Sequence, residues 1–257
     1  MHWSNFGRIP GGALHEEEGI VWFETPVQRL PYNGVIHTRL PEGEDTDRVV
    51  GRVCERMRAR NTDLFWMETP NAAPADLGER LRRHGLEPVE TLIGMLLDLG
   101  DDDRAQDEQA AEVRVVEVHD DDQLEQFIGL TAAYWELDGG QREEMAEIHR
   151  LYRPGFAWGH RYLAYDGGRP VGKGYLSTAG PPGVASIYGM SVLPEARGRG
   201  VASTLTGALL RRAREEGFSR VALHSSQMAE GVYRRAGFKA ICPLTVYATA
   251  ALWADEH

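Results

Sequence analysis

The spacing of apolar and polar residues changes several times along the second half of the chain, and each pattern predicts an element. Residues 113–118 (VRVVEV) alternate as a strand does, whereas 119–137 begin with Asp residues and continue with apolar residues at helical spacing. A second short helix is predicted over 141–151. Residues 161–180 contain two apolar runs separated by DGGRP, a turn signal typical of a β-hairpin.

Strands and helices then alternate to the end of this half. The elements predicted are a strand, a helix, a strand, a short helix and a strand over residues 183–194, 201–215, 218–226, 229–236 and 241–252. The helix over 201–215 has its apolar residues on one face, and Gly217 is a typical stop signal behind it. The predicted order, β-α-α-β-β-β-α-β-α-β, indicates a mixed α+β fold.

The first half repeats part of this order at an offset of about 153 residues. VIHTRLPE at 35–42 is similar to YGMSVLPE at 188–195, and each precedes a helical pattern, a strand, a further helix and a Gly-hydrophobic pair. Either a duplicated fold or convergence on a common pattern explains this similarity. After the shared L-P-E the two copies differ, because the first continues GEDTDRVV and the second ARGRGVAS.

The length of 257 residues exceeds that of most single domains, so two domains are expected. The acidic stretch at 100–112 is expected to be a solvated linker and not a cation site, which places the domains at 1–99 and 113–257. No apolar run approaches the roughly 20 residues of a membrane helix. The start, MHWSNFGRIPGG, has no signal-peptide pattern, so we expect a cytoplasmic protein without membrane contact.

Charge and cysteine usage exclude several classes of partner. The two cysteines, Cys54 and Cys242, give neither a disulfide framework nor zinc-site spacing, and the nine histidines include no H-E-x-x-H. We therefore expect no metal. The net charge of -11 argues against a nucleic-acid partner and slightly favours a cationic small molecule.

The segment PEARGRGVAS at 194–203 carries the clearest candidate chemistry. Glycines after a strand let backbone N–H groups converge on an anion, and the following helix adds its positive N-terminal end, so a phosphate site is predicted. The P-loop pattern G-x-x-x-x-G-K-[ST] is absent. A dinucleotide fingerprint would need glycine at Ser203 and a parallel βαβ context, which the preceding hairpin does not favour.

Two motifs fit a known family. RGRGVA at 197–202 matches [RQ]-x-x-G-x-[GA], and SQMAEGVYRRAGF at 226–238 is similar to N-x-x-A-x-x-x-Y-x-x-x-G-F, with Ser226 at the Asn position. On these motifs, residues 113–253 resemble the GNAT superfamily of acetyl-CoA-dependent N-acetyltransferases. The resemblance implies an α+β GNAT fold with a mixed sheet, in a tandem form in which residues 19–99 are a degenerate second GNAT unit.

The resemblance also implies residues that bind acetyl-CoA. The pyrophosphate would lie on the backbone amides of Gly198 to Ala202, with the Arg199 side chain near phosphate or solvent. The pantetheine arm and the thioester carbonyl would lie on a strand that splays from the next strand around Leu223 to Ser225, and Ser226 could bind the pantetheine or a water. The expected cofactor-binding residues are Met190, Ser191, Val192, Arg197, Gly198, Arg199, Gly200, Val201, Ala202 and Ser226.

The reaction implied is direct attack of a neutral amine on the thioester, with Tyr233 as the general acid for the leaving thiolate. Tyr233 could instead be a packing residue of an amphipathic helix. The base stays open, because the strand VASIYGMSV contains no acid: His224, Glu136 and water are the candidates. The aromatic residues that either line an acceptor pocket or belong to the core are Tyr134, Trp135, Trp158 and Tyr188.

The first half lacks the glycine loop and has Leu81 near the position of the tyrosine, so a structural role is expected for it. The expected function is acetylation of a primary amine of a small molecule. The alternatives are acetylation of a protein or peptide amine and a non-catalytic acetyl-CoA sensor, against which Tyr233 argues. An acyl donor other than acetyl-CoA also stays open.

Overall fold

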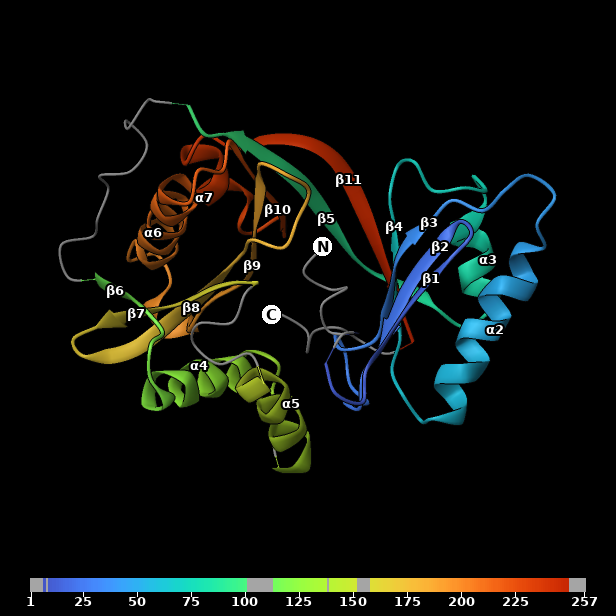
Figure 1. The fold of residues 1–257 in the computed structure, drawn as a ribbon, viewed down its shortest axis with the longest axis horizontal. Coiled ribbons are helices and arrows are strands. Elements are labelled where there is room, and N and C mark those ends of the chain that lie inside the picture. Colours follow the sequence, from blue (N-terminus) through green and yellow to red (C-terminus); the bar gives the residue numbers. More distant parts are fainter. Residues whose placement is uncertain (1–6, 8, 101–112, 138, 152–157, 250–257) are drawn as a thin grey trace. The chain divides into compact units, whose positions relative to one another are not determined.

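The computed structural model describes residues 7, 9–100, 113–137, 139–151 and 158–249 (Figure 1). The chain divides into two compact units. The C-terminal unit contains the described residues of Gly94–Ile241, and the N-terminal unit contains those of Trp3–Ile93 and Cys242–His257. Consequently two strands, β5 (Glu87–Asp98) and β11 (Lys239–Ala248), begin in one unit and end in the other.

The C-terminal unit is a mixed sheet with the strand order β5-β10-β9-β8-β7-β6. The strands β6 to β9 pair in antiparallel fashion, whereas β9 and β10 are parallel. Helices α4 and α5 lie on one face of this sheet and α6 on the other (Figure 1). Its elements are β6 (Val113–Glu117), α4 (Asp121–Tyr134), α5 (Gly139–Leu151), β7 (Gly159–Asp166), β8 (Arg169–Ser177), β9 (Val184–Val192), η2 (Pro194–Ala196), α6 (Val201–Glu215), β10 (Arg220–Ser225) and α7 (Glu230–Arg235).

The predicted order of elements in this half is confirmed, and α6 has the predicted bounds. The hairpin turns at Gly167 and Gly168, whose φ values of 56° and 84° are those of a two-residue turn that favours glycine. The expectation that this region lacks a parallel βαβ unit was wrong. Helix α6 carries the chain back to the starting end of the sheet, so that β10 runs parallel to β9.

Helix α6 packs closely against β8 because two glycines face it. A Cβ at Gly172 would lie 2.9 Å from Cγ1 of Val201 in α6. A Cβ at Gly174 would lie 3.1 Å from Cδ1 of Leu209 in α6 and 2.4 Å from Sδ of Met190 in β9. Neither position has room for a side chain. The alternation of a strand therefore directs the residue between them, Lys173, to the opposite face, which α4 covers.

The N-terminal unit repeats the arrangement with the strand order β1-β2-β3-β4-β11. Strands β3 and β4 are parallel, and β11 pairs antiparallel with β4. Helices α2 and α3 pack over a core that includes Met57, Trp66 and Leu81. Its other elements are β1 (Ala13–Glu17), β2 (Ile20–Glu24), β3 (Gly34–Thr38), α2 (Thr46–Ala59), β4 (Phe65–Glu68) and α3 (Leu77–Arg83).

The elements β3-α2-β4-α3 follow one another in the same order as β9-α6-β10-α7, as the sequence repeat predicts. The two units differ from the expected ranges 1–99 and 113–257 because the end of β5 and the end of β11 each belong to the other unit. Residues 94–98 of β5 belong to the C-terminal unit, where β5 lies beside β10, and residues 242–248 of β11 belong to the N-terminal unit. Most of the expected linker, residues 101–112, lies outside the described residues.

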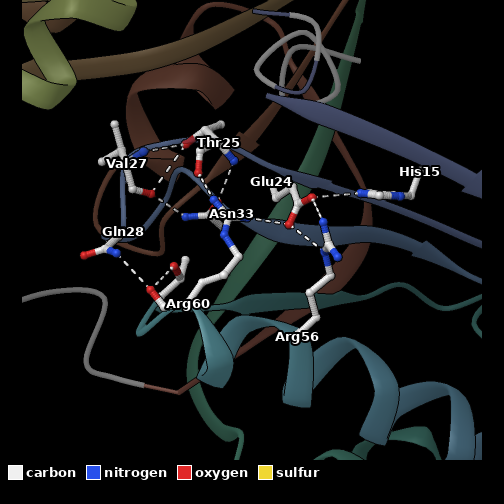
Figure 2. Close-up of polar contacts among 9 residues, drawn as sticks. His15, Glu24, Thr25, Val27, Gln28, Asn33, Arg56 and Arg60 are labelled. Atoms are coloured by element: carbon white, nitrogen blue, oxygen red, sulfur yellow. Dashed lines mark hydrogen bonds and ion pairs between the residues drawn. The ribbon is translucent and has the colours of Figure 1, made fainter. Parts of the chain in front are cut away.

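A buried carboxylate ties α2 to β2 in the N-terminal unit (Figure 2). Glu24 is 4% exposed and accepts hydrogen bonds from Arg56 Nε at 2.9 Å and Nη2 at 2.6 Å, and also from Arg60. His15 Nε2 lies 3.3 Å from the same carboxylate. Burial by itself raises the pKa of Glu24, but the two arginines outweigh it and bring the pKa down to about 2. The carboxylate is therefore charged throughout the physiological range.

Candidate active site

The turn into α6 presents backbone N–H groups to solvent. Gly198 and Gly200 have φ values of 75° and 80°, in the left-handed region that glycine adopts most easily. Gly200 is the N-cap of α6; its carbonyl accepts from Thr204 N at 2.9 Å, and no side chain caps the N–H groups of the first turn. A Cβ at Gly198 would meet nothing within 4 Å. Open space and uncapped N–H groups at a positive helix end suit a bound phosphate.

The arginine side chains of this turn have different surroundings. Arg199 Nη1 lies 2.5 Å from Oδ2 of Asp166, a carboxylate that is only 14% exposed. Arg199 thus neutralises an acid beside the turn, which would otherwise repel a phosphate. Arg197 is exposed. The structure therefore offers backbone N–H groups, more than the Arg199 guanidinium, as the anion-binding element.

Strand β9 separates from β10 just before this turn. Their parallel pairing runs from Val184 with Arg220 to Ile187 with Leu223, and no register pair follows. Beyond that point β9 stays paired only with β8, as the pair Ser191 with Lys173 shows. The edge of β9 that faced β10 is thus free of ladder partners in the segment containing Met190, Ser191 and Val192, as expected for a splayed strand.

Tyr233 lies in α7 and is 6% exposed, with its ring edge-on to Phe238 at a centroid distance of 5.8 Å. Burial, and to a smaller degree the neighbouring Tyr134, raises the pKa of its phenol, so the phenol stays protonated. Ser226 Oγ accepts from Ala229 N at 3.3 Å and so fixes the chain at the start of this helix. Within the described chain the Tyr233 hydroxyl has no hydrogen-bond partner of its own.

The two candidate bases occupy different places. The His224 ring lies edge-on to Tyr188 at 6.3 Å, and burial lowers the pKa of His224 to about 4, so the imidazole is neutral near pH 7. Glu136 follows α4 in an exposed position with a φ of 49°. The structure therefore brings His224 into contact with Tyr188, one of the predicted acceptor-wall residues. Among the described residues, no hydrogen bond or ion pair links Glu136 to His224 or Tyr233.

The predicted aromatic wall is partly assembled. Tyr134 and Trp135 lie edge-on at 5.2 Å at the end of α4, and Tyr134 is close enough to Tyr233 to affect its pKa. The Trp158 carbonyl accepts from the Tyr175 hydroxyl at 2.7 Å.

Lys173 is a residue that the sequence analysis missed. It is 3% exposed, and its Nζ donates to the Gly189 carbonyl at 2.9 Å. Burial, together with the nearby Arg161, lowers the pKa of Lys173 to about 7. A lysine between two glycines of a hairpin is typical of a solvent-exposed position. The two glycines could have indicated otherwise, because glycine on both sides of a strand residue predicts a helix packed closely against the opposite face of the sheet.

The corresponding region of the N-terminal unit is closed. The Thr38 carbonyl accepts from Ala73 N at 3.2 Å, and Leu40 N donates to the Ala73 carbonyl at 3.1 Å, so the chain itself pairs with the edge that follows β3. The N-cap of α2 is Asp45, whose side chain accepts from Arg48 N. This acid blocks the helix end and repels anions.

The tyrosine also has a counterpart in the N-terminal unit. Leu86 N donates to the Leu81 carbonyl at 3.0 Å, as Phe238 N does to the Tyr233 carbonyl at 3.0 Å. Leu81 therefore occupies the position equivalent to Tyr233, as its place in the repeat predicted, and it is fully buried. It carries no proton to donate.

Residues 125–238 match the acetyltransferase (GNAT) family. The matched segment lies within the C-terminal unit and contains both motifs at 197–202 and 226–238. The chain therefore carries a GNAT acyltransferase domain, and this family uses acetyl-CoA as its acyl donor. No curated protein matches the chain.

Solved structures with the GNAT fold are similar to most of the chain, including its N-terminal unit. A GCN5-related N-acetyltransferase from Kribbella flavida is 20% identical with a TM-score of 0.68, over 94% of this chain and 91% of that one. One from Sphaerobacter thermophilus is 15% identical with a TM-score of 0.66, over 94% and 83%. A tandem GNAT protein from the clavulanic acid biosynthesis pathway is 17% identical with a TM-score of 0.63, over 96% and 85%. The fold is thus a tandem GNAT fold.

The described residues contain no group of three or more His, Cys, Asp and Glu side chains that could hold a metal ion. In the same part of the chain, every helix is too short or too polar to cross a membrane.

Proposed function

We propose that this protein catalyses acetyl-CoA-dependent acetylation of a primary amine on a small molecule. One observation supports this most: β9 leaves β10 after Ile187 and leads, through the short helix η2, into the open turn at Gly198 and Gly200. A free strand edge suits the amide-bearing pantetheine arm, and an uncapped helix N-terminus suits a pyrophosphate. The strand edge and the helix N-terminus follow each other within one unit, as the pantetheine arm and the pyrophosphate follow each other in coenzyme A.

The backbone would do most of the binding. The N–H groups of Gly198, Arg199, Gly200, Val201 and Ala202 would hold the pyrophosphate, with the exposed Arg197 side chain at its margin. The strand edge at Met190, Ser191 and Val192 would hold the pantetheine and the thioester carbonyl. Ser226 would act chiefly by capping the start of α7. Acetyl-CoA supplies a thioester, whose acetyl group passes to the amine nitrogen and whose sulfur leaves as a thiolate.

Tyr233 would donate the proton that the leaving sulfur needs. Its raised pKa keeps the phenol in the protonated form that a general acid requires. Its place in the family motif and the absence of a competing protein partner for its hydroxyl among the described residues support this role.

His224 is the base we favour, through a hydrogen bond to the incoming amine or to a water that removes its proton. A neutral imidazole has a free acceptor nitrogen, although the pKa of about 4 makes it a weak base. Its contact with Tyr188 at 6.3 Å supports a position facing the acceptor. Glu136 is the alternative base, and its exposure fits a role at the mouth of the site.

We further propose that the N-terminal unit binds no acetyl-CoA. The edge beyond β3 is paired with Ala73, the helix end carries Asp45, and Leu81 replaces the phenol. Each of the three elements of the C-terminal site thus lacks a working equivalent. The role of the N-terminal unit would be structural.

The proposal is tested by release of free thiol from acetyl-CoA in the presence of amino acids, polyamines, amino sugars, aminoglycoside antibiotics and an amine-bearing peptide. We expect release with at least one small amine. Release with the peptide alone would favour a protein acceptor, and binding of acetyl-CoA without release for any amine would favour a sensor.

Tyr233→Phe keeps the ring and removes the proton, so kcat should fall roughly 100-fold with little change in KM. Tyr165→Phe is the matched control, because Tyr165 is also buried but its hydroxyl binds Gln126 of α4. It should keep the wild-type kcat. Equal kcat values for the wild type and Tyr233→Phe would refute the acid role.

A further inference from the structure

Strand β9 contains a bulge next to the segment proposed to bind pantetheine. Between the register pairs Lys173 with Ser191 and Tyr175 with Tyr188, β9 has one more residue than β8. Gly189, within this interval, has a φ of 57°. A bulge disrupts the ladder locally, and Gly189 lies in the interval of β9 that has no register partner in β8.

A lysine side chain donates a hydrogen bond to this bulge. Lys173 Nζ donates to the Gly189 carbonyl at 2.9 Å, and the same Nζ lies 5.0 Å from the centroid of the Phe127 ring of α4. Lys173 belongs to β8, so this bond joins the neighbouring strand to the bulge through a side chain. It is made on the α4 side of the sheet, opposite to α6.

Burial of the Lys173 amine lowers the stability of the fold. Lys173 is 3% exposed, and among the described residues it has no carboxylate partner. Burial of an amine with one hydrogen bond and one ring contact destabilises a fold relative to an apolar side chain of similar length. Such a residue is explained more readily by a functional role than by stability.

The position of the bond indicates what it does. Pairing of β9 with β10 stops at Ile187, the bulge follows at Gly189, and Met190 is the next residue. The hydrogen bond from Lys173 is therefore made at the point where β9 begins to diverge from β10. A shift of the Gly189 peptide would move the Met190 backbone with it.

We propose that Lys173 is a positioning residue for the acyl-CoA site: it holds the Gly189 carbonyl in the bulge and thereby fixes the backbone of Met190 to Val192. The inference rests on the proposed function, since it gives this segment its ligand. Lys173 itself need not touch the substrate.

The test compares Lys173→Met with the wild type by calorimetric titration of coenzyme A, by amide hydrogen exchange of residues 189–192, and by steady-state kinetics. Loss of one hydrogen bond corresponds to a weakening of coenzyme A binding of roughly tenfold. We expect that weakening, faster exchange at these amides and an unchanged or higher melting temperature. Tyr165→Phe, which removes another contact between the sheet and α4, should bind coenzyme A as the wild type does.

Two further variants keep the test informative if Lys173→Met folds poorly. Lys173→Gln retains an N–H donor one atom shorter and should give an intermediate affinity. Gly189→Ala should weaken binding, and the effects of Gly189→Ala and Lys173→Met should be strongly non-additive in the double variant if both act through the bulge. Additive effects would contradict the inference.

The outcomes separate the two proposals. If the wild type binds no coenzyme A, the proposed function fails. If the wild type binds it and Lys173→Met binds it equally well with unchanged amide exchange at 189–192, the positioning role fails while the proposed function stands.

Discussion

Replacement of Lys173 by Met should stabilise the protein at neutral pH, in contrast to most substitutions of buried residues. The pKa of Lys173 is about 7 in the folded chain, against its ordinary value of 10.5. Between these two values the unfolded chain holds a proton that the folded chain has lost. The free energy of unfolding of the wild type therefore rises as the pH rises from about 7 toward 10.5, because the folded chain no longer holds the charge. Below pH 7 the folded chain must bury the charged amine, and the loss of stability is complete.

The magnitude follows from the size of the shift. A difference of about 3.5 pKa units corresponds to a cost of about 5 kcal/mol below pH 7. Against this, Met leaves the Gly189 carbonyl without its donor, which costs about 1–3 kcal/mol. The net gain at pH 6 is then about 2–4 kcal/mol, or a rise in melting temperature of roughly 5–10 °C for a chain of this size. Arg161 of β7 contributes to the lowered pKa and is kept in both proteins.

The assay is thermal unfolding of both proteins from pH 6 to pH 9.5, analysed as the difference between them so that other titrating groups cancel. Linkage predicts that the advantage of Lys173→Met shrinks by about 3 kcal/mol over this range. A variant that is less stable at pH 6, with a difference that does not depend on pH, would show that Lys173 is not a buried amine of lowered pKa.

Other predictions concern the ion network, the exchanged strands and the base. Glu24→Gln should lower the free energy of unfolding at pH 7 by about 3 kcal/mol, because the stabilisation by the charged form is present above pH 4.5 and lost as the pH falls through about 2. Glu44→Gln, at an exposed pair with Arg48, should stay within about 0.5 kcal/mol in the same denaturant titration; equal losses would contradict the account. A fragment of residues 113–257 lacks β5, the neighbour of β10, and should be insoluble or unfold without cooperativity by circular dichroism; a soluble, cooperative fragment would argue against the strand assignment. His224→Gln should lower kcat more than Glu136→Gln in the thiol-release assay, and the reverse order would make Glu136 the base.

Local patterns predicted the elements well because their ends carry local signals. Gly200 and Gly217, on either side of α6, have φ values of 80° and 79° and mark where helical geometry begins and ends. The two glycines of DGGRP likewise mark the hairpin. The open turn and the order of elements in the repeat were visible for the same reason.

Long-range pairing was not visible in the sequence. The apolar pattern of β5 or β11 shows that each is a strand, but an apolar strand pairs equally well with either unit, so the exchange of their ends between the units was not predicted. The parallel pairing of β9 and β10 was missed because a hairpin in β7 and β8 says nothing about the strand added later. The role of Lys173 depends on a bulge in the neighbouring strand, which single-strand periodicity does not reveal.

In the proposal above, the C-terminal GNAT unit binds acetyl-CoA and the N-terminal unit cannot. Calorimetric titration of the full chain with acetyl-CoA measures this directly through the stoichiometry. We expect one molecule bound per chain, and loss of that binding when Gly200 is replaced by Val, which disfavours the left-handed φ of 80° at the turn. Two molecules per chain, or one molecule whose binding is unaffected by Gly200→Val, would contradict it.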